Sequence, residues 1–400
     1  MQKANTFQTE NVVIISVAHM VHDIYTAFLA PILPLIIEKL GMTYAQAGLL
    51  SVIQRAPSLL NPFVGIIADK ANLRYFIIIF PLITAVCMSL LGLAPSYTVI
   101  AILLFIMGIS STLFHVPAPV MIAEVAANKI GRGMSLYMLG GELARTIGPL
   151  VILGAVSLWG LEGTYKLIPF AFVASLILFV KLKNIKISDK FKNVKKENRA
   201  RETFMNLLPL FITLGGIIFF RSFMKGALTT FLPTYLHLNG TSLWMAGISL
   251  SVLQGAGAAG TIVAGILSDR IGRRNMMIII SIASPALMWL FIISDSCFIL
   301  PILLFLGFFL FATGPVMLAV VNNLQTDRPS FVNGIYMTLN FSISALTIML
   351  TGLSGDILGL ATTYKLAALL ALFSIPFTLR LSDTNLKRDN SGLDARHGKA

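Results

Sequence analysis

The segment GILSDRIGRR, residues 265–274, separates two long apolar runs, and GIIADKANLR, residues 65–74, shares its pattern G-x-x-x-D-x-x-x-x-R at an offset of 200 residues. Two further landmarks keep nearly the same offset. TYKL occurs at 164–167 and again at 363–366, and LPLI at 33–36 corresponds to LPTY at 232–235. Three matches in one register indicate that the chain is an internal duplication of two similar halves.

Both halves are unusually apolar. Of the 400 residues, 56% are hydrophobic and only 12% are charged, whereas about a quarter of an average soluble protein is charged. Twelve apolar segments are each long enough to cross a hydrocarbon core of about 30 Å as a helix. They are residues 11–37, 45–68, 75–94, 97–124, 132–159, 163–182, 204–235, 243–267, 276–294, 297–322, 330–355 and 360–381. The sequence therefore predicts an all-α membrane protein with twelve transmembrane helices, six in each half.

The net charge of +13 is unevenly distributed along the chain. Of the 30 lysines and arginines, 23 lie in the termini and in loops after even-numbered helices, and only three (Lys39, Lys166 and Lys365) lie in loops after odd-numbered helices. Because basic loops stay cytoplasmic, both termini are expected in the cytoplasm, on the inner side of the plasma membrane. We expect an N-terminal bundle at 1–182, a basic cytoplasmic linker at 183–203, and a C-terminal bundle with a short tail at 204–400.

The paired loops resemble the signature of the major facilitator superfamily, which joins helices 2 and 3 and again helices 8 and 9. The resemblance implies two six-helix halves related by an axis along the membrane normal, with the substrate site near mid-membrane between them. It also implies that charged loop residues help to hold one conformation. The implied gating residues are Gly65, Asp69, Arg74, Gly265, Asp269, Arg273 and Arg274.

A narrower resemblance is to the fosmidomycin-resistance type of exporters within that superfamily. The matching residues are His19, Asp23 and Tyr25, Phe114 with His115, Gly148 with Pro149, and Arg221 with Ser222. The segment GGELARTIGPL, 140–150, is similar to the fifth-helix glycine and proline signature of antiporters, which favours export. Two features depart from the exporters: Val116 and Pro117 follow His115, and the fifth helix carries Glu142 and Arg145.

The first apolar segment carries a polar stripe. At about 100° per residue on a helix, Ser16, His19, His22, Asp23 and Thr26 fall on one face. His19 and Asp23 are four residues apart, so they can meet directly and exchange a proton. We interpret Asp23 with His19 as the proton-coupling pair. The alternatives are a pair that only fixes helix packing and a transition-metal site of the two histidines and Asp23, which lacks a clear further ligand; we expect no metal.

Other ionisable residues lie at similar depth in the apolar segments, where such groups face water or each other. Glu142 and His115 are further candidates for proton coupling. Six residues are candidates for substrate binding: Arg55, Arg145, Arg221, Lys225, His22 and Tyr25. Together with Asp23, these candidates include two carboxylates and four cationic side chains. This excess of positive charge favours an anionic or zwitterionic substrate. Glu142 and Arg145 are three residues apart, so a local ion pair is the alternative there.

These observations predict a secondary active transporter that exports a small anionic or zwitterionic organic compound or drug in exchange for protons. An organic-anion uptake symporter is the first alternative, and a membrane sensor or scaffold that transports nothing is the second. The sequence contains no nucleophile–base constellation or phosphate-binding loop, so an enzyme is not expected. The expected partners are the substrate, protons and membrane lipid. We expect no cofactor and no nucleic acid, and we expect a monomer.

Overall fold

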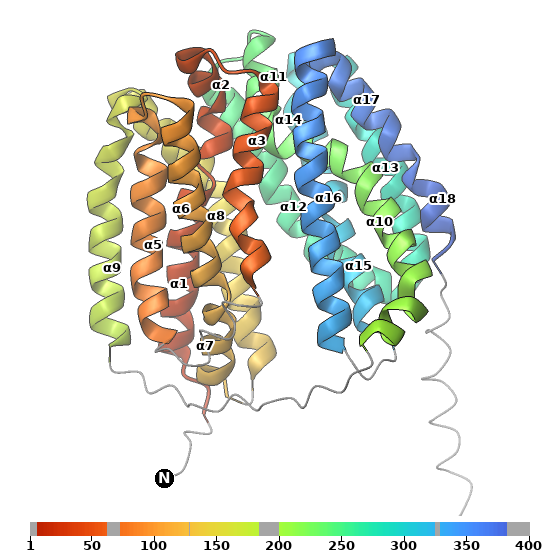
Figure 1. Cartoon of the computed structure of the whole chain (residues 1–400), viewed down its shortest axis with the longest axis horizontal. Coiled ribbons are helices and arrows are strands. Elements are labelled where there is room, and N and C mark those ends of the chain that lie inside the picture. Colours follow the sequence, from red (N-terminus) through yellow and green to blue (C-terminus); the bar gives the residue numbers. More distant parts are fainter. Residues whose placement is uncertain (1–5, 62–72, 128, 184–199, 325–328, 382–400) are drawn as a thin grey trace, which may run out of the picture. The chain divides into compact units, whose positions relative to one another are not determined.

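The computed structural model describes residues 6–61, 73–127, 129–183, 200–324 and 329–381 (Figure 1). Within these ranges every regular element is a helix, as expected for an all-α membrane protein. The predicted gating residues Gly65 and Asp69, residues 184–199 of the predicted linker and residues 382–400 of the predicted tail lie outside the described residues.

The helices follow the predicted apolar segments. The first half contains α1 (Thr9–Thr26), α2 (Leu29–Leu40), α3 (Tyr44–Arg55), α5 (Leu73–Ser89), α6 (Tyr97–His115), α7 (Pro117–Val125), α8 (Ile130–Trp159) and α9 (Ile168–Leu182). The second half contains α10 (Ala200–Thr230), α11 (Leu232–Leu238), α12 (Leu243–Ile271), α13 (Arg273–Ile293), α14 (Ile299–Phe311), α15 (Thr313–Asn322), α16 (Pro329–Leu358), α17 (Leu360–Leu372) and α18 (Ser374–Leu379). Short 3-10 helices are η1 (Ala56–Leu60), η2 (Leu91–Leu93), η3 (Glu162–Leu167) and η4 (Ser296–Phe298).

Eleven segments in the described ranges are long and apolar enough to cross a membrane. The predicted span at 45–68 is described only to residue 61, and α3 with η1 form that part of it. The twelve-helix prediction therefore agrees with every span that is fully described.

Prolines explain why several predicted spans contain two helices. The span predicted at 11–37 is divided between α1 and α2 near Ala27. Pro31 cannot donate a hydrogen bond to the carbonyl of Ala27, and its ring crowds that carbonyl. Pro57 likewise follows the end of α3, and Pro117 follows the end of α6. The second of these breaks places His115 at the last residue of α6.

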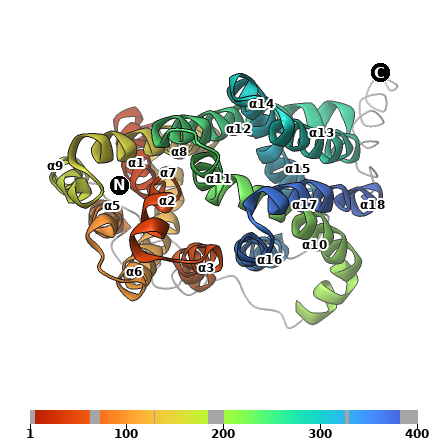
Figure 2. The ribbon, with the colours of Figure 1, turned by 90° about the horizontal axis from the view of Figure 1, so that it is seen from above.

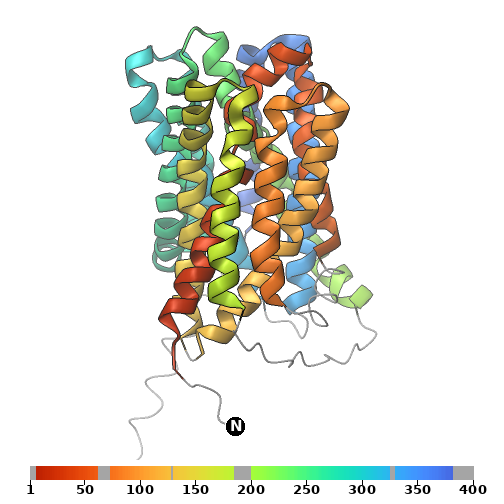
Figure 3. The same ribbon diagram turned by 90° about the vertical axis from the view of Figure 1, so that its left-hand side faces the viewer.

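The described chain divides into two compact units. Unit 1 comprises residues 1–194, 228–255 and 348–360, and unit 2 comprises the remaining residues. In unit 1, α1 packs against α8, α5 and α9, and Figure 2 shows it among these helices from above. Figure 3 shows that helices of this unit run side by side along one direction. The polar stripe of α1 is therefore enclosed by neighbouring helices.

Each unit has its own apolar core. In unit 1 this core surrounds Val12, Ile15 and Phe114. In unit 2 it surrounds Leu214, Met277 and Val316. These apolar contacts fix the helices that carry the charged residues discussed below.

Candidate functional site

Three side chains of the α1 stripe are buried together. His22 is 0% exposed, His19 is 7% exposed and Asp23 is 8% exposed. The His19 Nε2 atom lies 3.3 Å from Asp23 Oδ2, and the His22 Nδ1 atom lies 2.8 Å from Asp23 Oδ1. The predicted pairing of His19 with Asp23 is therefore present, and His22 contacts the same carboxylate.

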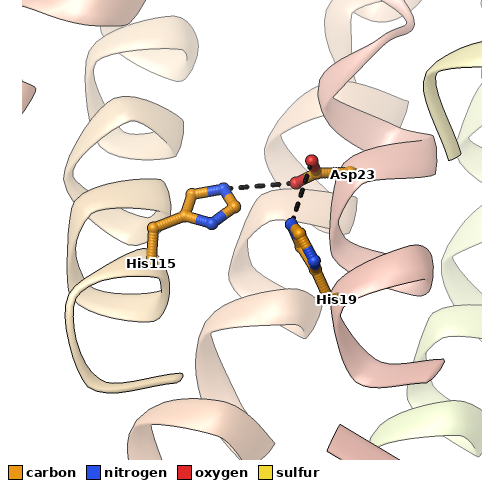
Figure 4. A group of neighbouring side chains, drawn as sticks. All are labelled: His19, Asp23 and His115. Atoms are coloured by element: carbon orange, nitrogen blue, oxygen red, sulfur yellow. Dashed lines mark ion pairs between the residues drawn. The ribbon is translucent and has the colours of Figure 1, made fainter. Parts of the chain in front are cut away.

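A third imidazole reaches this carboxylate from another helix. His115 Nε2, at the end of α6, lies 3.2 Å from Asp23 Oδ1. Figure 4 shows the carboxylate of Asp23 between the rings of His19 and His115. The fold thus joins three residues that were predicted to take part in proton coupling. We call His19, His22, Asp23 and His115 the histidine cluster.

The hydrogen-bond partner of His19 Nδ1 determines which ring nitrogen of neutral His19 carries the hydrogen atom. Its Nδ1 lies 2.7 Å from the backbone carbonyl oxygen of Tyr137, which can only accept. We therefore assign the hydrogen of neutral His19 to Nδ1. The contact from Nε2 to Asp23 is then a hydrogen bond only when a further proton resides on His19 or Asp23.

The same reasoning applies to His22 through two hydroxyl groups. Ser110 donates to the carbonyl oxygen of Phe80 at 2.7 Å, so its oxygen must accept from Thr84 at 2.8 Å. Thr84 has then used its only hydrogen, and it accepts from His22 Nε2 at 3.1 Å. His22 Nδ1 consequently also needs a shared proton to bind Asp23. Both contacts to the carboxylate are places where a proton can be held.

Glycines of α8 allow this helix to approach α1 closely. A Cβ atom at Gly141 would lie 2.6 Å from His19 Cε1, and one at Gly140 would lie 2.5 Å from the carbonyl oxygen of Ser16. A Cβ at Gly148 would lie 2.7 Å from the Cβ of Ala27. The small residues of GGELARTIGPL therefore pack α8 against the polar face of α1 and position the ring of His19.

A cavity of about 320 Å³ within unit 1 adjoins the histidine cluster. Asp23 and His115 line it, together with Arg55 and Arg145. Thr229, Thr230, Leu250 and Gln254 line it from the second half of the chain. The cavity thus brings a carboxylate, an imidazole and two guanidinium groups from distant segments to one space that is large enough for a small organic ligand.

Part of the positive charge that lines this cavity is neutralised by a carboxylate. Arg145 forms an ion pair with Glu142, as the spacing of the two residues permits. No ion pair of Arg55 occurs within the described ranges, and Arg55 is an exposed residue that lines the cavity. Arg55 is accordingly the cavity cation that an anionic ligand can reach without displacing a carboxylate.

Four of the six predicted binding residues do not line this cavity, namely Tyr25, His22, Arg221 and Lys225. The hydroxyl group of Tyr25 donates to the carbonyl oxygen of Leu167 at 2.9 Å, and Tyr25 lines a separate, largely apolar cavity of about 480 Å³ with Trp159 and Phe170. His22 is fully buried and is not among the residues that line the cavity. The roles of Tyr25 and His22 in substrate binding stay predictions.

Arg221 and Lys225 belong to unit 2. Arg221 is 5% exposed, and its Nη1 atom donates to Ser284 Oγ at 3.0 Å and to the Ile280 carbonyl oxygen at 3.3 Å. Its Nη2 atom is buried without a hydrogen-bond partner among the described residues. Lys225 is exposed, and its Nζ atom lies 5.3 Å from the ring centroid of Phe311. Their predicted role in binding substrate also stays a prediction.

The described gating residues lie at helix ends. Asp269, near the end of α12, pairs with Arg273 at 2.6 Å, and Arg273 also donates to Ser268 at 3.0 Å. Gly265 precedes them on α12, and Arg274 follows Arg273 on α13. In the first half, Arg74 donates to the carbonyl oxygen of Lys183 at 2.5 Å.

Several residues of the site were not predicted. Thr84, Ser110 and Tyr137 support the histidine cluster, and Gln54 and Gln254 line the cavity. The two glutamines lie within predicted membrane spans, so their polar side chains could have indicated from the sequence that they face a cavity. Tyr137 contributes its backbone carbonyl oxygen, which no side-chain pattern can reveal.

The comparison with protein families decides the identity of the fold. The model of the Major Facilitator Superfamily matches residues 15–348. The chain belongs to this superfamily. It is therefore a membrane-spanning member of a family of transporters.

Individual relatives of this superfamily member agree. It is 26% identical to the fosmidomycin resistance protein of Escherichia coli over 384 residues, covering 93% of each chain. It is 25% identical to the MFS-type transporter YfnC of Bacillus subtilis, covering 98% of this chain and 97% of the relative. A solved bacterial homologue of the human lysosomal transporter Spinster has a TM-score of 0.77 at 14% identity, covering 93% of this chain and 96% of that structure. The first relative confirms the narrower resemblance, and the solved structure confirms the fold.

Proposed function

We propose that this transporter exports a small anionic or zwitterionic organic compound in exchange for protons. The observation that carries the proposal is that Asp23 and Arg55 line one cavity while Asp23 also contacts three imidazoles. A proton site and a cationic binding surface thus share the same enclosed space.

The two ligands share one cavity and are coupled through charge. A proton held between Asp23 and an imidazole adds positive charge to the cluster, whereas an anion at Arg55 brings negative charge into the same cavity, and these opposite charges attract each other. Exchange therefore requires that the two ligands bind in different access states. If one access state binds the proton and the other binds the substrate, transport of one in one direction drives the other in the opposite direction. This exchange is the essential feature of an antiporter.

The name of the Escherichia coli relative supports a drug or drug-like substrate. Fosmidomycin is a phosphonate, and a guanidinium group suits phosphonate and carboxylate oxygens through paired hydrogen bonds. The charge distribution of the loops supports cytoplasmic termini in a plasma membrane. We further expect the monomer to be the working unit, because the cavity lies within one chain.

The test is transport by the purified full-length chain in proteoliposomes. Vesicles loaded with phosphonates, carboxylates, amino acids or neutral sugars are given a pH gradient of either sign, and the movement of each compound is followed. The proposal expects an anionic or zwitterionic compound to move against its own gradient, opposite to the protons. Movement in the same direction as protons would establish the uptake symporter instead, and absence of flux for every compound would support the sensor or scaffold.

A further inference from the structure

We propose that His19, Asp23 and His115 form a binding site for a divalent transition-metal cation such as Zn²⁺. The sequence placed only residues of the first helix together, and a metal site made from them lacked a further ligand. The fold supplies His115 from α6. One ligand atom from each of the three residues lies within 4.8 Å of the others.

The spacing of the ligand atoms suits a tetrahedral ion. Zinc bonds of about 2.0–2.1 Å to imidazole nitrogen and carboxylate oxygen place neighbouring ligand atoms about 3.3 Å apart. His19 Nε2 lies 3.3 Å from Asp23 Oδ2, and His115 Nε2 lies 3.2 Å from Asp23 Oδ1, so each imidazole nitrogen has this separation from one of the two carboxylate oxygens. Imidazole and carboxylate together also favour later first-row metals over Mg²⁺ or Ca²⁺.

The hydrogen-bond partner of His19 provides a second, independent observation. Its Nδ1 donates to the Tyr137 carbonyl oxygen at 2.7 Å, so the Nε2 lone pair of the neutral ring is directed to Asp23. Metal-bound imidazoles commonly donate their other N–H to a backbone carbonyl, because this fixes the tautomer and the ring orientation. The ring is also stacked on Tyr137, with centroids 4.0 Å apart and an interplanar angle of 15°. His19 is therefore already oriented as a metal ligand.

The surroundings allow access for the ion and compensate part of its charge. Asp23 and His115 line the cavity of about 320 Å³, which offers a route for the ion and space for a water molecule as fourth ligand. Asp23 supplies a negative charge to the ion, and Glu142 pairs with Arg145, which lines the same cavity. Because the ligands come from α1 and α6, a bound ion joins these two helices directly.

The experiment measures Zn²⁺ binding to the full-length, tag-free protein in detergent by calorimetry, with thermal unfolding as a second readout. No substrate or pH gradient is present, so the result is independent of the proposed transport function. We expect one ion per chain and a higher Tm with Zn²⁺, because an ion bound only to the folded state stabilises it. The variant His115→Gln should weaken binding by at least about tenfold.

His237→Gln is the matched control. His237 lies on α11, and its ring nitrogen contacts the carbonyl oxygen of Thr241 at 3.3 Å. This variant should bind Zn²⁺ as the unmodified protein does. Absence of stoichiometric binding, or equal binding by the unmodified protein and His115→Gln, overturns the proposal. A His115→Gln protein with an unchanged Tm in the absence of zinc rules out misfolding as the cause of lost binding.

Discussion

The carboxylate of Asp23 on α1 lies 3.2 Å from the Nε2 atom of His115 on α6, while His19 and His22 contact the same carboxylate from its own helix. Asp23 is therefore the common partner of three imidazoles contributed by two helices. Any change of its protonation state alters three contacts at once, which makes it the residue through which charge and helix packing are coupled.

Replacing Asp23 with Asn should abolish transport driven by a pH gradient while preserving substrate binding. Asn keeps the size and hydrogen-bonding capacity of the side chain but cannot titrate. The measurement is flux into proteoliposomes with and without an imposed gradient. Glu10→Gln is the matched control on α1, because Glu10 pairs only with the exposed Lys181 in the described structure and should transport normally. Uphill transport by the Asp23→Asn protein would move the proton site to another residue, and Glu142 would be tested next.

Replacing Gly141 with Ala should shift the pH dependence of transport and lower stability by about 1–3 kcal/mol. The added methyl group would meet the ring of His19 at 2.6 Å, so the ring must move away from Asp23. Gly154→Ala is the control on the same helix, because no described atom lies within 4 Å of a Cβ there. Thermal unfolding and pH-dependent flux check both variants. Identical pH profiles for the two would show that the close approach of α8 does not position His19.

Replacing Arg55 with Gln should weaken the binding of an anionic substrate by about tenfold or more. A hydrogen bond to a charged group contributes about 1.5–3 kcal/mol, and about 1.4 kcal/mol corresponds to a tenfold change in affinity. Arg270→Gln, which makes the same substitution at an exposed position in the last turn of α12, should leave affinity unchanged. Calorimetric titration with the transported compound distinguishes the two. Equal affinity in both variants would remove Arg55 from the binding surface.

Replacing Arg221 with Gln should lower substrate affinity while the protein still folds. Gln retains an amide that can donate to Ser284, but it removes the buried charge and the unpartnered Nη2 atom. Ser284→Ala serves as the comparison, since it removes the hydrogen-bond partner and keeps the charge. Affinity and expression level are measured for both. Lost expression of Arg221→Gln with unchanged affinity in the folded fraction would assign Arg221 to structure.

Replacing Asp356 with Ala should loosen the contact between α3 and α16 in unit 1. The two carboxylate oxygens of Asp356 accept hydrogen bonds from the backbone amides of Tyr44 and Ala45, at 2.6 and 2.8 Å. Loss of such a cap costs about 0.5–2 kcal/mol, so both amides should exchange hydrogen faster. Asp295→Ala is the control, because the side chain of Asp295 makes no cap hydrogen bond at η4. Hydrogen exchange followed by mass spectrometry gives the comparison, and unaltered exchange at residues 44 and 45 would contradict the expectation.

The sequence alone was sufficient for the helical architecture. Each predicted membrane span that is fully described contains helices, because a backbone in lipid must satisfy its own hydrogen bonds. The exact helix ends were less predictable. The span at 11–37 contains a break near Ala27, where Pro31 removes a hydrogen bond, and periodicity alone does not distinguish a kinked helix from a broken one.

Within one helix the sequence also determined which side chains meet. His19 and Asp23 are four residues apart, and Glu142 and Arg145 are three residues apart, so helical geometry places each pair on one face. The burial of a carboxylate with histidines in an apolar helix was likewise visible as a functional signal. These predictions rest on local geometry, which needs no knowledge of how helices pack.

Only the tertiary structure decided which helices complete the site. His115 reaches Asp23, Tyr137 orients His19, and Arg55 shares a cavity with both Asp23 and Gln254 because α1, α3, α6, α8 and α12 pack around one space. It also decided that Tyr25 donates to Leu167 and lines a different cavity. Residues far apart in a chain meet through the rotation and spacing of packed helices, which depend on the sum of many small apolar contacts and on close approaches such as that at Gly141. These contacts involve residues from many segments, so they cannot be predicted from any short segment of the sequence.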